Sequence, residues 1–361
     1  MFATFIIFEC AAMMFSGGVE KKLIEFGWDE PDTKFMREHI QEMERMPFDG
    51  CVFHVNYETA DGKTGRFTWE CWGRRAFSEE EVRGAIEDLK NTPFKRFKHN
   101  FLRFNVTPGD VDWFDDFSAI LSNARLAARI AREGGCAGIL FDIEQYQFPL
   151  FDYNKQKYRD RKSWRQYSAQ ARRRGREIMI AFQSEYPDIT VFLTFGYCLP
   201  WVQSEGGRKE LSEVSYGLLA PFLDGMLEGA AGGSKIVDGC ELAYPFKDVS
   251  RFDWAYRVMS EEVLKIVFMP EKYRRVFSFG FGIWMDCKWR ELGWHTDDLS
   301  KNYYTPQEFE ESLYKALTTA DEYVWIYTEQ PRWWTAEGGP RDLPEEYIQA
   351  VWNARRRAGL K

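Results

Sequence analysis

The amino-acid sequence predicts a single-domain α/β fold, a (β/α)8 TIM barrel with long loops after its strands. Eight short apolar runs recur along the chain, and amphipathic segments separate them. Parallel strands need right-handed helical crossovers, which such alternation provides. The 361 residues also leave room for loop insertions, because one barrel takes roughly 250. An open doubly wound sheet is the alternative, but its glycine-rich phosphate turn has no counterpart after the first run.

The predicted strands are short and rich in β-branched or aromatic residues, as expected for parallel strands buried on both faces. In chain order they are LIEFGW (23–28), CVFHV (51–55), FLRFNV (101–106), GILFDIE (138–144), TVFLTFG (190–196), KIVDGCELAY (235–244), VFSFGFGIW (276–284) and YVWIYTE (323–329). The barrel domain is therefore expected to span residues 19–361.

Helix start and stop signals lie between these runs. Two capping boxes mark helix starts, Ser78 with Glu81 and Thr305 with Glu308. Paired glycines, which favour helix ends, follow two other amphipathic segments. Further helices are expected near 33–46, 116–133, 163–185, 216–230, 251–267 and 345–358.

Charge and hydropathy exclude several classes of protein. The net charge is −8 with both signs interspersed, whereas a nucleic-acid-binding protein would show a basic stripe. No run reaches the roughly 20 apolar residues of a membrane span. Residues 1–18 are apolar but lack a basic start and contain Glu9, so they read either as a remnant export signal or as a packed N-terminal arm. Localisation and oligomeric state stay open.

No cofactor or metal is expected. The seven cysteines show no metal-binding spacing, and none of the four histidines stands in an HxH or HExxH motif. An odd number of cysteines, several within apolar strands, also argues against a disulfide framework.

Aromatic residues make up 17% of the chain, and many of the 14 tryptophans fall in predicted loops. Loop tryptophans suit flat platforms for the apolar faces of sugar rings, although large loops also use aromatic side chains for internal packing. The loop tryptophans are Trp28, Trp69, Trp72, Trp201, Trp284, Trp289, Trp294, Trp333 and Trp334.

Active sites of (β/α)8 barrels lie at the C-terminal ends of the strands, and polar residues gather there in this sequence. The fourth predicted strand, GILFDIEQY (138–146), carries the sharpest signal, because alternation points Asp142 and Glu144 to the same face. Two close carboxylates raise the pKa of one of them, as a general acid requires. The alternatives are that both pair with a nearby arginine such as Arg103, or that they bind an ion.

GILFDIEQY resembles the fourth-strand motif of barrel glycoside hydrolases, most closely the chitinase type. That resemblance implies that Glu144 donates a proton and that Asp142 assists it. The sixth strand, DGCELAY, and the Thr-Glu end of the eighth depart from the chitinase pattern, which speaks against an N-acetyl-assisted mechanism. The resemblance is therefore to the barrel glycoside hydrolase superfamily over roughly residues 20–360, and to no single family.

A glycosidase needs a second carboxylate, and Glu329 and Glu241 both qualify. Glu329 ends the strand opposite Glu144, which favours a gap of roughly 6.5–9.5 Å and inversion of configuration. Glu241 lies two strands away, where roughly 5–5.5 Å and retention are easier to reach. We favour Glu329 as the partner, with Glu241 binding sugar hydroxyls.

Further strand-end residues are candidates for substrate binding, although a strand-end histidine or asparagine can equally be structural, and Asp29 can cap the next helix. They are Trp28, Asp29, His54, Asn56, Asn105, Tyr197, Tyr244, Trp284, Arg332 and Trp333. The loop 56–77 is expected to shape specificity, and its Arg74 and Arg75 hint at an anionic sugar unless they are ordinary surface residues.

The sequence therefore favours a glycosidase of carbohydrate metabolism that degrades an oligo- or polysaccharide. One alternative is a carbohydrate-binding barrel without catalysis. Another is a lyase or isomerase with Mg²⁺ held by Asp142, Glu144 and Glu241. The lyase also needs a Lys or His base, and no lysine stands at a strand end.

Overall fold

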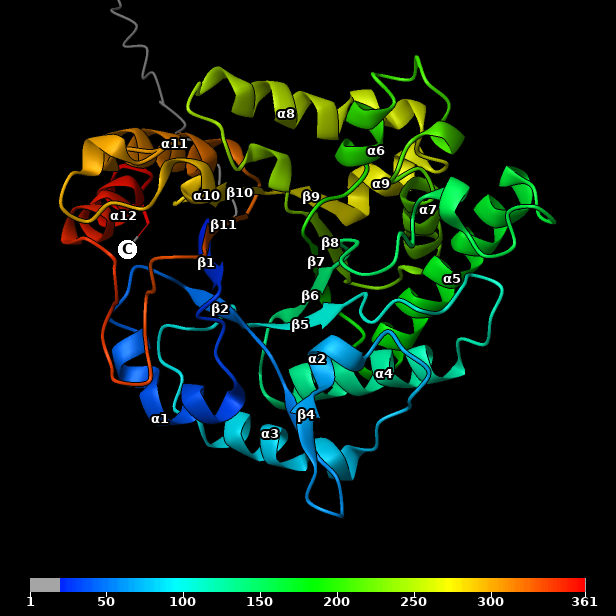
Figure 1. The fold of residues 1–361 in the computed structure, drawn as a ribbon, viewed down its shortest axis with the longest axis horizontal. Coiled ribbons are helices and arrows are strands. Elements are labelled where there is room, and N and C mark those ends of the chain that lie inside the picture. Colours follow the sequence, from blue (N-terminus) through cyan, green and yellow to red (C-terminus); the bar gives the residue numbers. More distant parts are fainter. Residues whose placement is uncertain (1–19, 361) are drawn as a thin grey trace, which may run out of the picture.

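The computed structural model describes residues 20–360 and contains one main sheet whose paired strands are all parallel (Figure 1). The segment 1–18, discussed above as an arm or export signal, lies outside the described residues. The strands of this sheet are β1 (Lys22–Gly27), β2 (Gly50–Phe53), β5 (Phe101–Asn105), β6 (Gly138–Asp142), β7 (Thr190–Leu193), β8 (Lys235–Asp238), β9 (Phe277–Phe279), β10 (Phe281–Trp284) and β11 (Tyr323–Thr328). They pair in the order β10, β11, β1, β2, β5, β6, β7, β8, β9.

Residues 277–284 close the sheet into a ring. β9 pairs with β8, and β10 pairs with β11 after the single intervening residue Gly280. A Cβ atom on Gly280 would lie 2.5 Å from the carbonyl oxygen of Tyr323, so this crossing requires glycine. Because β9 and β10 act as one strand, the fold is an eight-stranded parallel barrel, as the sequence predicts.

Helices surround the ring in alternation with the strands (Figure 1). They are α1 (Thr33–Met43), α2 (Phe67–Glu70), α3 (Glu79–Asn91), α4 (Ser118–Glu133), α5 (Trp164–Glu185), α6 (Cys198–Gln203), α7 (Leu219–Gly229), α8 (Ser250–Ser260), α9 (Pro270–Val276), α10 (Trp289–Leu292), α11 (Pro306–Thr319) and α12 (Glu345–Arg357). The predicted capping boxes begin α3 and α11.

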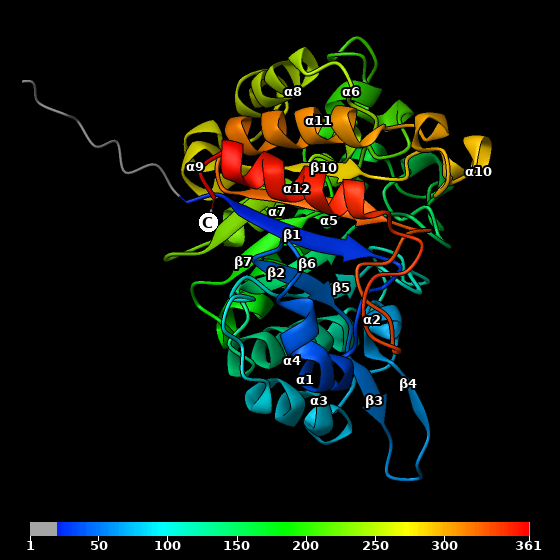
Figure 2. The ribbon, with the colours of Figure 1, turned by 90° about the vertical axis from the view of Figure 1, so that its left-hand side faces the viewer.

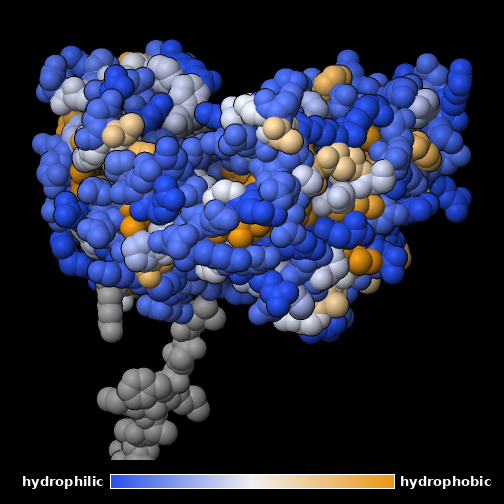
Figure 3. Space-filling view, turned by 90° about the horizontal axis from the view of Figure 1, so that it is seen from below, coloured by the Kyte–Doolittle hydropathy of each residue, from blue (hydrophilic) through white to orange (hydrophobic). Residues whose placement is uncertain are grey.

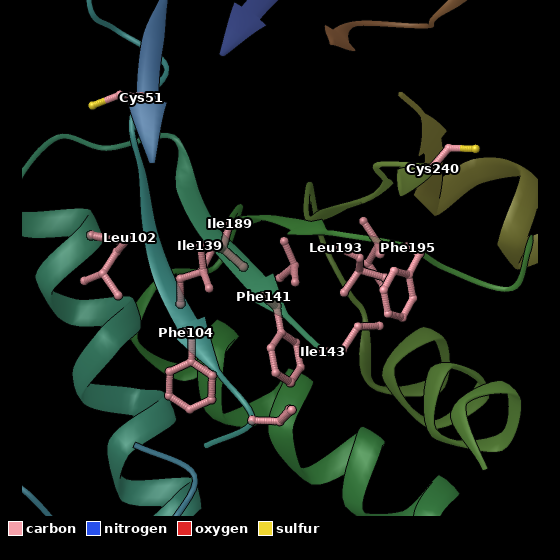
Figure 4. Packing of buried hydrophobic residues seen from close by; sticks show 14 of the residues in the cluster. Cys51, Leu102, Phe104, Ile139, Phe141, Ile143, Ile189, Leu193, Phe195 and Cys240 are labelled. Carbon is pink, nitrogen blue, oxygen red and sulfur yellow. The ribbon is translucent and has the colours of Figure 1, made fainter. Parts of the chain in front are cut away.

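Two hydrophobic cores follow from the alternation of side chains along each strand. One fills the ring and includes Phe101 and Leu140, whereas the other packs the strands against the helices. In Figure 4, Phe104 of β5 and Phe141 of β6 point from the strands toward the helices, where both rings contact Phe182 of α5. Because side chains alternate, the residues before and after each of these phenylalanines point into the ring. The alternation therefore decides which polar side chains reach the mouth of the barrel.

Three segments differ from the sequence-based expectation. The predicted strand 235–244 ends at Asp238, because the chain turns sharply at the next residues. The predicted helix 251–267 breaks after Ser260, and a 3-10 turn and α9 follow it. The loop 56–77 contains an unforeseen hairpin of β3 (Asn56–Glu58) and β4 (Thr64–Arg66), which projects from the barrel (Figure 2).

The face drawn in Figure 3 is largely hydrophilic, with hydrophobic residues in small, scattered areas. Across residues 20–360, no helix is both long and apolar enough to cross a membrane. The six cysteines of this part of the chain are all free and buried.

Helices α5 and α7 pack so closely that glycine is required at their contact. A Cβ atom on Gly225 of α7 would lie 1.8 Å from the carbonyl oxygen of Arg172 in α5. We expect Gly225→Ala to lower the free energy of unfolding by about 1–3 kcal/mol, because two backbones must separate. Gly84→Ala is the control, since a Cβ atom on this exposed α3 residue meets nothing within 4 Å. It should raise stability by up to about 1 kcal/mol. Urea unfolding of both variants tests the packing, which equal shifts would contradict.

Candidate active site

A cavity of about 510 Å³ opens at the C-terminal ends of the strands, and each of the eight barrel strands or the loop after it contributes to its wall. Its polar and aromatic lining residues are Phe26, Trp28, Glu30, His54, Arg66, Trp69, Arg103, Asp142, Glu144, Tyr146, Thr194, Glu241, Tyr244, Trp284, Arg290, Tyr327, Glu329 and Arg332. All four predicted catalytic residues therefore line one cavity.

Arg103 of β5 links two carboxylates in the wall of this cavity. Its guanidinium donates from Nη1 to Glu30 at 3.0 Å and from Nε to Asp142 at 3.1 Å. His54 Nδ1 lies 3.2 Å from the other oxygen of Glu30. Burial opposes ionisation of Glu30, but Arg103 and His54 outweigh it and hold the pKa of Glu30 below its usual value. In this network, two buried carboxylates, Glu30 and Asp142, therefore share the guanidinium group of Arg103.

Asp142 is occupied by this network. Besides Arg103, the Tyr146 hydroxyl donates to its carboxylate at 3.0 Å, and the backbone N–H of Glu144 donates at 3.1 Å. The ion-pair interpretation considered from the sequence therefore applies to Asp142, and Arg103 is its partner. Asp142 also orients the backbone of Glu144, which is a means of positioning that residue.

Glu144 is half-buried just beyond the end of β6. Burial raises the pKa of Glu144, and the neighbouring negative charge of Asp142 raises it further. The Tyr146 hydroxyl and Arg103 oppose this rise, and Glu329 adds to it from across the cavity. A carboxyl group in such a setting holds its proton toward neutral pH, as a general acid must.

Glu241 reaches the cavity from a strained turn. Cys240 before it has a φ of 41°, in the left-handed region that non-glycine residues rarely adopt. The buried Asp238 accepts the Cys240 N–H at 3.0 Å, and the Glu241 N–H donates to the Thr194 carbonyl at 3.0 Å. Burial raises the pKa of Asp238 to about 6. Strain of this kind persists only where the surroundings fix it, so the position of Glu241 is closely specified.

The Glu241 carboxyl itself is free to meet a ligand. Burial raises its pKa well above the usual range, and the charges of Glu144 and Asp142 add to this. Within residues 20–360, no side chain donates a hydrogen bond to it. The charge of Glu144 thus adds to the rise in the pKa of Glu241.

Glu329, just after β11, has a different environment. The Trp289 indole donates to its carboxylate at 2.8 Å, the Tyr327 hydroxyl donates at 3.3 Å, and Arg290 forms an ion pair with it. Asp286 supports the backbone by accepting the N–H groups of Glu329 and the next residue. Glu329 therefore has several hydrogen-bond and ion-pair partners, whereas burial and the charge of Asp142 favour the acid form of Glu144.

Half of the predicted substrate-binding residues line the cavity: Trp28, His54, Tyr244, Trp284 and Arg332. The other half do not line it: Asp29, Asn56, Asn105, Tyr197 and Trp333. Each of these makes a structural contact instead.

The contacts explain why these five residues lie outside the cavity wall. Asp29 faces away from the ring and accepts the N–H of Trp333, whose own side chain is fully buried, and Asp32 rather than Asp29 caps α1. The other three residues each donate a side-chain hydrogen bond. Asn56 donates to Asp32 in a neighbouring groove, Asn105 donates to Asp142, and Tyr197 donates to the buried Asp224.

The loop tryptophans divide between the two roles considered from the sequence. Trp28, Trp69 and Trp284 line the cavity. Four others are buried in the protein: Trp72, Trp201, Trp333 and Trp334. Internal packing therefore explains several of them, and three remain as candidate sugar platforms.

Arg74 and Arg75 are surface residues outside the cavity. Arg74 pairs with Asp115, and Arg75 pairs with Glu81. The ordinary explanation for these two arginines therefore holds. The loop supplies Arg66 and Trp69 to the cavity instead.

Several lining residues were absent from the predicted set. Tyr327 belongs to the inward series of β11 that leads to Glu329, so alternation along this strand also indicates Tyr327. Tyr146 lies beyond the end of β6, where alternation no longer applies. Arg290 lies in the short helix α10, between β10 and α11, and no local signal points to it.

No group of three or more His, Cys, Asp or Glu side chains within residues 20–360 is arranged to hold a metal ion.

No family model matches the sequence, and no curated protein matches it. Among solved structures, an endocellulase from Pyrococcus horikoshii is similar at a TM-score of 0.44 and 9% identity, over 94% of this chain and 92% of that one. A GH5-4 endoglucanase from an uncultured bacterium is similar at 0.46 and 13%, over 90% and 86%. A psychrophilic family 10 endo-β-1,4-xylanase is similar at 0.41 and 11%, over 93% and 96%. The (β/α)8 fold itself follows from the strand pairing of this chain.

Proposed function

We propose that this protein is a glycoside hydrolase that cleaves an oligo- or polysaccharide with two carboxyl groups of the barrel cavity. The observation that carries the proposal is the contrast between Glu144 and Glu329. They share one cavity, but burial and the charge of Asp142 favour the acid form of Glu144, whereas Glu329 forms an ion pair with Arg290 and accepts a hydrogen bond from the Trp289 indole. Glycosidases need one carboxyl group in each state.

Glu144 is the proton donor in this scheme. It transfers its proton to the glycosidic oxygen as the bond from that oxygen to the sugar carbon breaks, so the leaving group departs as a neutral alcohol. Tyr146 and Asp142 position Glu144 and set its acidity.

Glu329 is the ionised partner. In an inverting enzyme it takes a proton from the attacking water, whereas in a retaining enzyme it bonds to the sugar carbon and water later releases the sugar. Glu241 binds sugar hydroxyls or exchanges roles with Glu329. Trp28, Trp69 and Trp284 offer aromatic surface to the sugar rings.

A screen on plant, algal and bacterial glycans with a reducing-end assay tests the proposal. Proton NMR of the first product then shows whether configuration is inverted or retained. Binding without turnover would point to the non-catalytic carbohydrate-binding barrel, and loss of activity in EDTA would point to a metal-dependent enzyme.

The pH dependence of kcat/KM should follow Glu144. Activity requires its protonated form, so activity falls as pH rises through the pKa of Glu144, which lies above its usual value. Asp142→Asn removes a negative charge that raises this pKa, and should move the alkaline limb to lower pH. Tyr146→Phe removes a group that lowers it, and should move the limb to higher pH. Shifts in the same direction for both variants would contradict the assignment of Glu144 as the acid.

A further inference from the structure

Two of the four arginines that line the cavity form no ion pair with its carboxylates. Arg66, Arg103, Arg290 and Arg332 all line it. Arg103 and Arg290 are neutralised by carboxylates of the wall. Arg66 and Arg332 form no ion pair with any side chain in the described part of the chain. Arg332 is half-buried and Arg66 is exposed, so in a protein of net charge −8 the cavity wall offers two guanidinium groups to an anionic ligand.

Arg332 has donors to spare. Its side chain makes one long hydrogen bond, 3.5 Å from Nη1 to the Pro331 carbonyl oxygen, and a guanidinium has five N–H donors. Its backbone is fixed by two hydrogen bonds with Arg341, at 2.8 and 3.0 Å. It acts at longer range on the buried Glu25 and Asp29, where it opposes the rise that burial gives to their pKa. The donors of Arg332 are therefore available to a ligand at a fixed site.

Trp28 lies beside this arginine and is 54% exposed. The guanidinium carbon of Arg332 is 5.7 Å from the centre of the Trp28 ring, and that of Arg290 is 5.5 Å from it. The Trp289 ring packs edge-on against Trp28 at 6.4 Å. A sugar ring stacked on Trp28 would carry its substituents next to two guanidinium groups.

We propose that the substrate is an anionic glycan, and that Arg332 binds a carboxylate or sulfate group of the sugar stacked on Trp28. A guanidinium matches the planar carboxylate and the sulfate with paired N–H donors, which a hydroxyl group cannot use in the same way. Arg66, on the loop that also carries Trp69, gives the same cavity a second unpaired cation for the charge on a neighbouring sugar. This inference deepens the proposed function and depends on it only for the cleavage step.

Binding to the Glu144→Gln variant tests the inference without cleavage. The probes are trigalacturonate with its carboxyl-reduced neutral counterpart, and a sulfated galactan oligosaccharide with its desulfated counterpart. One anionic probe should bind at least about tenfold more tightly than its neutral counterpart, as expected for hydrogen bonds to a charged group. Which pair shows the preference identifies the anion as carboxylate or sulfate.

Adding Arg332→Gln to Glu144→Gln should abolish that preference and leave binding of the neutral probe within about threefold. Arg83→Gln is the matched control, because Arg83 is an exposed arginine of α3 outside the cavity, and it should change neither affinity. Equal affinities for charged and neutral probes, no binding of either anionic probe, or a preference that survives Arg332→Gln would each overturn the inference.

Cleavage of the same four probes by the unmodified protein separates the two proposals. Preferential binding of an anionic probe with no cleavage of any glycan leaves the inference standing and overturns the proposed hydrolase. Cleavage confined to the neutral probes leaves the proposed hydrolase standing and overturns the inference of an anionic substrate.

Discussion

Replacing Glu144 with glutamine is expected to lower kcat/KM on glycans by a factor of about 10² to 10⁴, the usual contribution of a general acid. Glutamine keeps the size of the side chain but has no proton to give to the leaving oxygen. The loss should be much smaller on aryl glycosides with acidic leaving groups, because these depart without protonation. Initial rates on one glycan and one nitrophenyl glycoside measure both effects.

The matched control is Glu87→Gln, because Glu87 is an exposed glutamate of α3 that does not line the cavity. It should leave both rates and the melting temperature unchanged. Glu144→Gln should also keep the wild-type melting temperature, which shows that the loss is chemical. An equal loss on both substrate types would instead indicate that Glu144 binds substrate and does not donate a proton.

The same assay identifies the partner carboxylate. Glu329→Ala and Glu241→Ala are compared with and without sodium azide, a small anion that can take the place of a missing nucleophile or base. We expect azide to restore turnover in Glu329→Ala. Restoration in Glu241→Ala alone would exchange the roles of the two residues, and neither result would alter the assignment of Glu144.

Much of this site could be read from the sequence because strand phase is local information. In β6, Leu140 lies in the inner core, so Asp142 two residues later also faces inward, and Glu144 follows. The same phase in β11 carries Trp325 inside and leads to Glu329. Alternation therefore brings carboxylates from distant parts of the chain to one mouth.

The same rule, applied strictly, would have excluded Asp29. The inward residues of β1 are Ile24 and Phe26, and Trp28 continues the series, so Asp29 is out of phase and contacts the loop behind the barrel. Trp333 lies in that loop, fully buried. Strand phase therefore separates Asp29 from the inward series, but it carries no information about Trp333, which follows β11 in a loop.

Other features depend on tertiary contacts that no local pattern contains. The left-handed turn at Cys240 exists because the buried Asp238 holds it, and without this turn the strand pattern would extend through Glu241. The hydrogen bonds of Trp289 and Arg290 to Glu329 join segments 39 or more residues apart in sequence. The different surroundings of Glu144 and Glu329 arise from such contacts, so the sequence could name the acids but could not show what surrounds each of them.

Arg103→Met is expected to lower the free energy of unfolding by about 3–5 kcal/mol at pH 7, because it removes one partner from a buried ion pair and leaves charges behind. The side chains of Arg103, Glu30 and Asp142 are 9%, 8% and 1% exposed, so water cannot replace the lost guanidinium. The ring of Trp69, with its centre 4.7 Å from the guanidinium carbon, also loses its cation–π contact. Guanidinium chloride unfolding measures the change.

The pH dependence separates lost charge from lost packing. In the wild-type protein the lowered pKa of Glu30 contributes stability above its unfolded pKa, and that contribution is lost as pH falls through the folded pKa. In Arg103→Met the unpaired carboxyls instead favour protonation, so stability is present at low pH and is lost as pH rises. The difference between the two proteins should therefore shrink as the pH approaches about 4, near the ordinary carboxyl pKa.

Two further variants complete the argument about Arg103. Arg83→Met breaks an exposed ion pair with Glu80 on α3 and should cost no more than about 1 kcal/mol at any pH. Adding Glu30→Gln and Asp142→Asn to Arg103→Met removes the stranded charges and should recover part of the stability at pH 7. A loss that is independent of pH and is not recovered in the triple variant would mean that Arg103 serves as packing. In that case the charge network would not be what holds Asp142, and through it Glu144, in place.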